Sequence, residues 1–211
     1  MTDRRGWILG LLASPLTGCA AIDLATRQPP QLYALTPKST FTEGVARTSG
    51  TLMVETPTAT AGLNTRRIAL RPDPTRIDYY ADATWIEVLP LMVQNLITES
   101  IDNAGGIDAL GVASAGVRAD WALVTHIREF QAEYADLARA PTVRVVLEAR
   151  ILRLPRRTQL ARTSIAATAD AASTALPTVV QAFDDALGKV LKRLTIWVEE
   201  QVAKAESVKS S

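Results

Sequence analysis

The chain has 211 residues, of which 23 are lysine or arginine and 22 are aspartate or glutamate, so its formal net charge is only +1. This balance gives no electrostatic reason to bind nucleic acid, and the sequence has no polybasic segment for anionic lipid. Hydrophobic residue types make up 47% of the chain, which is ample for the core of one domain. Beyond the N-terminal region, no stretch is long and apolar enough to predict a membrane-spanning helix.

The N-terminal segment has the three zones of a secretory signal. Two arginines, Arg4 and Arg5, precede an apolar stretch over residues 6–15 that is too short to cross a bilayer. The four residues that close the segment are Leu16, Thr17, Gly18 and Cys19. Their order resembles the bacterial lipobox, so we predict that residues 1–18 are a lipoprotein signal peptide and that Cys19 carries the lipid.

Two alternatives concern this segment. The cysteine could follow an ordinary signal peptide by coincidence, and the adjacent arginines leave the general secretory and twin-arginine export routes open. Cleavage leaves a mature chain with equal numbers of basic and acidic residues and no free thiol, so its fold depends on packing. The residue after the cysteine is Ala20 rather than aspartate, which favours sorting to the outer membrane.

The mature chain divides into a tether, a body and a tail. Residues 19–50 lack periodicity and contain three prolines, which predicts a lipid-anchored tether with one short strand at 32–35. The folded body is expected over residues 51–204. Residues 205–211 are expected to form a flexible tail.

The first half of the body predicts short strands and one helix. A strand at 52–55 is followed by alternating segments at 67–71 and 76–80, which flank a proline-rich turn and indicate a hairpin. Apolar residues at helical spacing then predict a helix that starts near Pro90 and stops at Gly105-Gly106.

The second half predicts three longer strands, at 121–130, 143–154 and 159–168, and a final helix at 177–204. The middle strand has one apolar face, made of Val143, Val145, Leu147, Ala149 and Ile151. The last helix carries one apolar stripe, made of Val180, Phe183, Leu187, Val190, Leu191, Leu194, Trp197 and Val198. We therefore expect an α+β fold, with a mostly antiparallel sheet and two helices packed on one face.

Three aromatic residues, Trp85, Phe183 and Trp197, lie on the apolar faces of their segments and are expected to be buried. For Trp85 the alternative is an exposed docking residue, because tryptophan also anchors interfaces.

The sequence offers little for catalysis. His126, the single histidine, lies inside a predicted strand without partners at metal-ligand spacing, which favours a structural role. Asp184 and Asp185 fit the N-terminal end of the last helix, where carboxylates suit the helix dipole. We therefore predict no catalytic residue, no metal site, no cofactor and no enzymatic activity.

Several segments together resemble the ABC-type transport auxiliary lipoprotein family: residues 65–70, 77–85, 89–92, 179–187 and 197–198, following a lipid-attached cysteine at position 19. The resemblance runs from about residue 32 to 202. Residues 86–88 depart from the usual small and acidic residues, which affects local packing only. The family-motif residues, expected to be structural, are Arg67, Tyr79, Tyr80, Trp85, Pro90, Phe183 and Trp197.

The resemblance implies a non-catalytic outer-membrane lipoprotein that faces the periplasm in a lipid transport system. Its direct partner would be a periplasmic MCE-domain protein, with an ABC permease and an ATPase as indirect partners. A ring of identical subunits would suit the end of such a conduit. We expect the binding surface on exposed sheet edges or on the loop at 155–158. The alternatives are a lipoprotein that structurally activates a cell-wall or trans-envelope complex, and an envelope hydrolase.

Overall fold

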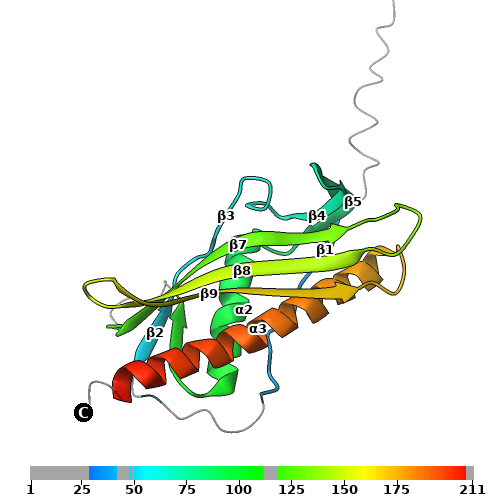
Figure 1. The fold of residues 1–211 in the computed structure, drawn as a ribbon. Coiled ribbons are helices and arrows are strands. Elements are labelled where there is room, and N and C mark those ends of the chain that lie inside the picture. The colour runs from blue at the N-terminus through cyan, green and yellow to red at the C-terminus, as the bar shows by residue number, and fades with distance from the viewer. Residues whose placement is uncertain (1–28, 42–47, 49, 112–117, 208–211) are drawn as a thin grey trace, which may run out of the picture.

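The computed structural model describes residues 29–41, 48, 50–111 and 118–207 (Figure 1). Its elements in chain order are β1 (Gln31–Tyr33), β2 (Thr51–Val54), β3 (Thr58–Ala59), β4 (Arg67–Asp73), β5 (Arg76–Trp85), α2 (Leu89–Ala104), β6 (Asp108–Gly111), β7 (Trp121–Glu133), β8 (Thr142–Arg153), β9 (Thr158–Asp170) and α3 (Leu176–Ser207). The predicted hairpin, the three long strands and both helices are confirmed at these bounds.

Strand β7 organises the sheet. One of its edges pairs along its whole length with β8, which pairs in turn with β9. Its other edge pairs successively with β2, β3 and β4, each over a few residues. Beyond β2 lies β6, and beyond β4 lie β5 and then β1. Strands β1 and β9 therefore lie at opposite margins of the sheet.

The expectation of a mostly antiparallel sheet is wrong, because the sheet is mixed. Among the described strands, the parallel pairs are β1–β5, β2–β6, β2–β7, β3–β7 and β4–β7, whereas β4–β5, β7–β8 and β8–β9 are antiparallel. The parallel pairs of β2, β3 and β4 with β7 form because the chain passes through α2 between β4 and β7, and a crossover returns the chain in the same direction. Strands β1 and β5 both precede α2, so their parallel pairing does not depend on this crossover. Hairpins between consecutive strands are visible in a sequence, whereas crossovers of this kind are not.

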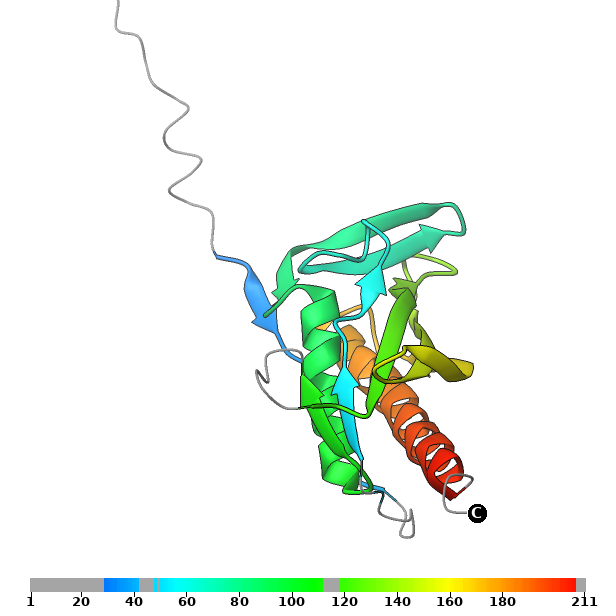
Figure 2. The same ribbon diagram turned by 90° about the vertical axis from the view of Figure 1, so that its left-hand side faces the viewer.

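Helices α2 and α3 pack on the sheet and against each other (Figure 2). The apolar face predicted for β8 is at most 1% exposed at all five positions. The stripe predicted for α3 is also buried, except at Trp197, which is partly buried. One continuous apolar core therefore lies between the helices and the sheet.

Both helices have the expected boundaries, with one extension. Pro90 lies in the first turn of α2, and Gly105 ends that helix in a left-handed conformation, with φ of 72°. Helix α3 continues through Ser207, so residues 205–207 are helical rather than part of a flexible tail. The apolar stripe explains this extension, because Val202 and Ala205 are both buried.

The part of the expected tether that the structure describes contacts the body. Strand β1 pairs with the end of β5, and Leu35 belongs to the core. The backbone N–H and the hydroxyl of Thr36 donate hydrogen bonds to the Asp184 carboxylate at 2.7 and 2.8 Å. Residues 31–36 are thus fastened both to the sheet and to α3.

Candidate functional site: the signature residues around β4, β5 and α2

Two of the seven family-motif residues lie in an aromatic cluster in the core. Trp85 is 1% exposed and Phe183 is fully buried, which confirms the predicted burial and excludes Trp85 as an exposed docking residue. The Trp85 ring meets the rings of Phe183 and Phe130 edge-on, with centroids 5.3 and 6.0 Å apart. Phe130 stacks on Phe183 at 5.2 Å. Sequence reasoning missed Phe130 as the third member, although its place on an apolar face of β7 was available as a signal.

The backbone around Trp85 is held by the segment before β4. The Trp85 N–H donates to the carbonyl of Arg66 at 2.8 Å, and the Arg66 side chain donates back to the Trp85 carbonyl at 3.2 Å. The Leu89 N–H donates to the carbonyl of Thr65 at 3.0 Å. Pro90 follows and is buried in the first turn of α2. These bonds fix the corner at which β5 passes into α2.

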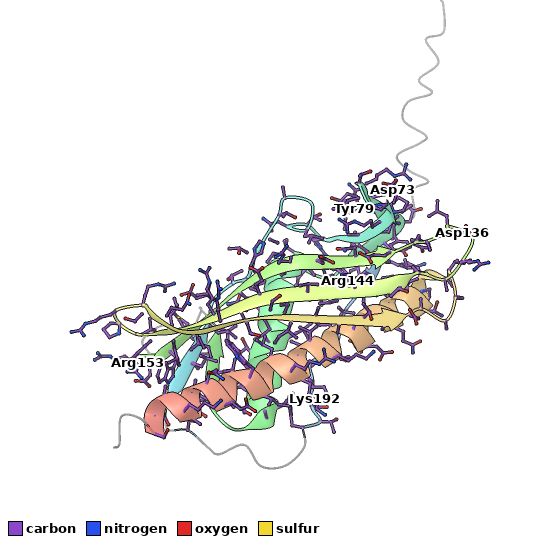
Figure 3. The ribbon with its side chains drawn as sticks, viewed as in Figure 1. Asp73, Tyr79, Asp136, Arg144, Arg153 and Lys192 are labelled. Atoms are coloured by element: carbon purple, nitrogen blue, oxygen red, sulfur yellow. The ribbon has the colours of Figure 1, made fainter. Side chains whose placement is uncertain are left out.

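Three further family-motif residues lie on β4 and β5, and Figure 3 labels one of them, Tyr79. The Arg67 guanidinium lies 3.7 Å from the centroid of the Tyr79 ring, a cation–π contact worth about 0.5–1 kcal/mol when exposed. The Tyr79 hydroxyl donates to the Gly62 carbonyl at 3.0 Å. The Tyr80 hydroxyl shares a 2.7 Å hydrogen bond with Tyr134, and burial raises the pKa of Tyr80 well above its usual value. Tyr80 therefore stays a neutral phenol.

The structure does not bring every predicted site residue to the region around β4, β5 and α2. Trp197 lies far along α3 from Phe183 and is partly buried, so its expected burial is only partly met. Cys19 and the lipobox residues Leu16, Thr17 and Gly18 lie outside the described residues, and their roles stay predictions.

The candidate polar residues have structural contacts. His126 is partly buried on β7, and its Nδ1 lies 2.9 Å from the Thr58 hydroxyl oxygen. Both oxygens of Asp184 accept hydrogen bonds from Thr36. Within residues 29–41, 48, 50–111 and 118–207, no three His, Cys, Asp or Glu side chains are grouped so that they could hold a metal ion.

One buried carboxyl group was not anticipated. Glu199 on α3 is fully buried, and its Oε1 accepts a 3.0 Å hydrogen bond from the Gly106 N–H. Its Oε2 is buried and has no hydrogen-bond partner among the described residues. Burial raises the pKa of this carboxyl group above its usual value. Gly106 therefore has a second role besides following the helix stop, because a Cβ there would lie 2.3 Å from Oε1.

In the described part of the chain, neither α2 nor α3 combines the length and the apolar character that a membrane crossing requires.

Comparison with solved structures identifies relatives of the fold. Protein XCC0632 from Xanthomonas campestris has a TM-score of 0.78 and 24% identity, and the match covers 84% of this chain and 99% of that one. An uncharacterized protein of known structure follows, with a TM-score of 0.64, 13% identity, and coverage of 81% and 99%. The hypothetical protein CT253 from Chlamydia trachomatis has a TM-score of 0.50, 11% identity, and coverage of 74% and 98%. At these identities the likeness shows the fold alone.

The sequence was also compared with curated proteins and with protein families. None of the curated proteins matches the chain. Residues 33–195 match the family described as ABC-type transport auxiliary lipoprotein component, a span that begins at the last residue of β1 and includes the family-motif residues from Arg67 to Phe183. The chain therefore belongs to the ABC-type transport auxiliary lipoprotein family.

Proposed function

We propose that this protein is a non-catalytic, outer-membrane lipoprotein subunit of an ABC/MCE-type system that moves lipids between membranes. Its direct partner is a periplasmic MCE-domain protein. The observation that carries the proposal is the family match over residues 33–195, which spans most of the folded body. The lipobox-like residues before Cys19 support the anchor.

The anchor sets how far the body stands from the membrane. The segment from Cys19 to Gln31, where β1 begins, spans at most about 40 Å when fully extended. Because β1 is fastened to β5, the sheet margin formed by β1 is the side of the body joined to the lipid. The remaining surface is then free to face a periplasmic partner.

A binding role also fits the contacts of the signature residues. Trp85 and Phe183 pack in the core, Arg67 stacks on Tyr79, and Tyr80 shares its hydroxyl with Tyr134. Each side chain is thus used to hold the β5–α2 corner and its neighbours. The family-motif residues therefore stabilise the folded body, and a partner would bind to other residues on its surface.

Co-purification from crosslinked envelopes tests the partner. The tagged full chain is expected to recover the MCE-domain protein together with permease or ATPase subunits. Repeated recovery of a cell-wall synthase without any transporter subunit would replace the proposal with the structural-activator function.

Metabolic labelling tests the anchor separately. Cys19→Ala is expected to remove incorporation of a labelled fatty acid and to leave an uncleaved or soluble protein. Fatty-acid label that survives this substitution would contradict lipidation at Cys19.

A further inference from the structure

The outer edge of β9 is covered along only part of its length. Among the described strands, β9 pairs with β8 alone. Near its C-terminal end, the carbonyls of Ala166 and Thr168 accept 2.9 Å hydrogen bonds from Arg193 and Lys189 on α3. Charged side chains of this kind protect a sheet edge from pairing with another chain. Helix α3 thus occupies this half of the edge.

The other half, residues 158–164, has no such cover from the described residues, and a register shift interrupts its pairing with β8 between Gln159 and Ala161. The β8–β9 ladder is regular from Ala161 onward, so outward-pointing backbone groups recur every second residue. Arg162 and Ser164 therefore direct their N–H and C=O groups to the same side as Ala166 and Thr168. No described side chain donates to these groups, and α3 diverges from β9 toward the β8–β9 turn (Figure 1).

This open half of the edge carries more positive than negative charge, although Glu148 lies near Arg150. The hydrogen bond from Arg128 lowers the pKa of the Glu148 carboxyl group, and the charge of Arg150 helps to lower it further. Arg150 on β8 lies directly opposite Arg162 on β9, and both side chains are exposed. Like charges placed opposite each other on neighbouring strands are destabilising. The nearest carboxylate on this face, Glu148, already accepts a 2.7 Å bond from Arg128. None of the described acidic residues forms an ion pair with Arg150 or Arg162.

A shallow groove lies beside the open edge of β9 and contains both arginines. It has a volume of about 460 Å³, and its lining includes Val124, His126, Glu148, Arg150, Arg162 and Ser164. The groove crosses β7, β8 and β9 on the face opposite the buried one. An anionic group seated here would meet both guanidinium groups, which bind carboxylates through paired hydrogen bonds.

The charge and the position of this edge select its occupant. A second copy pairing through the same edge would bring its own Arg150 and Arg162 against these two, which is unfavourable. A membrane surface also fits poorly, because β1, which leads to the anchor, lies at the opposite margin of the sheet. A periplasmic protein segment with carboxylates on one face carries the opposite charge to the two arginines, and it can reach an edge that lies away from the anchor.

We infer that the β9 edge over residues 161–164 is the docking site for an extended acidic segment of a partner protein. The segment adds as a strand beside β9, and its carboxylates lie over Arg162 and Arg150. Main-chain hydrogen bonds supply affinity and the arginines supply selectivity. The inference rests on the proposed function in taking the MCE-domain protein as the partner.

Charge reversal on the full lipidated chain tests the site. Arg150→Glu/Arg162→Glu is expected to weaken capture of the MCE-domain protein by about 30-fold or more. The matched control is Arg76→Glu/Arg139→Glu, which has the same charge change but lies near Asp73 and Asp136, at the opposite end of the strands (Figure 3). The control is expected to bind like the wild type. Equal binding by the reversed variant would overturn the site while leaving the proposed function intact.

A second measurement does not depend on the natural partner. A synthetic peptide of alternating valine and glutamate is expected to slow hydrogen exchange at the Arg162 and Ser164 amides at least tenfold. A valine–lysine peptide is expected to leave these amides unchanged. Unchanged exchange with the acidic peptide would overturn the inference even if the MCE-domain protein is captured. Binding to phosphatidylglycerol vesicles that is lost in the reversed variant would also overturn it, in favour of a membrane contact.

Discussion

The two ends of helix α3 are stabilised in different ways. Around Phe183, the helix packs on Trp85 and Phe130 in a fully apolar cluster. Around Glu199, it buries a carboxyl group whose Oε1 accepts a hydrogen bond from Gly106 and whose Oε2 has no partner within the part of the chain that the structure describes. At the first end, burial of apolar surface stabilises the fold. At the second end, part of that stabilisation is lost, because burying a carboxyl group with one unbonded oxygen costs free energy. One continuous helix therefore combines a purely apolar contact region with one that also buries a carboxyl group.

The largest expected effect lies at the aromatic end. Phe183→Ala removes a fully buried ring and is expected to lower the free energy of unfolding by about 3–5 kcal/mol, because a cavity remains. Chemical denaturation measures this loss. Leu91→Ala is the control, because Leu91 is 43% exposed and its loss should change stability by less than about 0.5 kcal/mol. Similar losses in both variants would contradict the packing argument.

The polar end is most sensitive at Gly106. An added Cβ would lie 2.3 Å from Glu199 Oε1, so Gly106→Ala is expected to lower the free energy of unfolding by about 1–3 kcal/mol. Gly188→Ala on α3 meets no neighbouring atom within 4 Å and should instead stabilise by about 1 kcal/mol. A double-mutant cycle with Glu199→Ala should show coupling above about 0.5 kcal/mol. Strict additivity would show that the clash is not what destabilises the variant.

The buried carboxyl group makes stability depend on pH. Because burial raises the pKa of folded Glu199, ionisation is easier in the unfolded chain. The folded state therefore loses stability as the pH rises above the unfolded value, about 4.3, and the loss is complete above the raised pKa. Glu199→Gln is expected to stabilise the protein at pH 8, on the order of 1 kcal/mol, and to have less effect at pH 4.

Thermal or chemical unfolding at both pH values measures this difference. Glu200→Gln serves as the control, because it makes the same substitution at the exposed neighbour on the same helix and should change stability by less than about 0.5 kcal/mol. A Glu199→Gln effect that is equal at pH 4 and pH 8 would remove the electrostatic explanation.

The smallest expected effect concerns the segment before β2. Asp184→Ala removes both acceptors for Thr36 and is expected to cost about 0.5 kcal/mol of global stability, because the hydrogen bonds are exposed. Hydrogen exchange at the Thr36 amide should speed up more clearly than elsewhere. Asp185→Ala should leave that amide unchanged. If both variants behave alike, Asp184 does not hold the segment.

Much of the fold could be predicted because it depends on local periodicity. The two-residue alternation of β8, the proline-rich turn between β4 and β5, and the apolar stripe of α3 are all readable in short windows. The same reasoning placed Trp85 and Phe183 in the core, because each lies on an apolar face of its own element. The lipobox and the family resemblance are also local, since they depend on residue order and spacing.

The tertiary structure decided what depends on residues far apart in the chain. The parallel pairing of β2, β3 and β4 with β7 depends on a crossover through α2, and no local pattern encodes which edge a returning strand will join. The sequence by itself thus determined the two helices, the longer strands with their buried faces, and the family, whereas the short strands β3 and β6 were not predicted. Only the folded chain brought Gly106 to Glu199 and Arg150 beside Arg162, because such contacts leave no periodic signal in either segment.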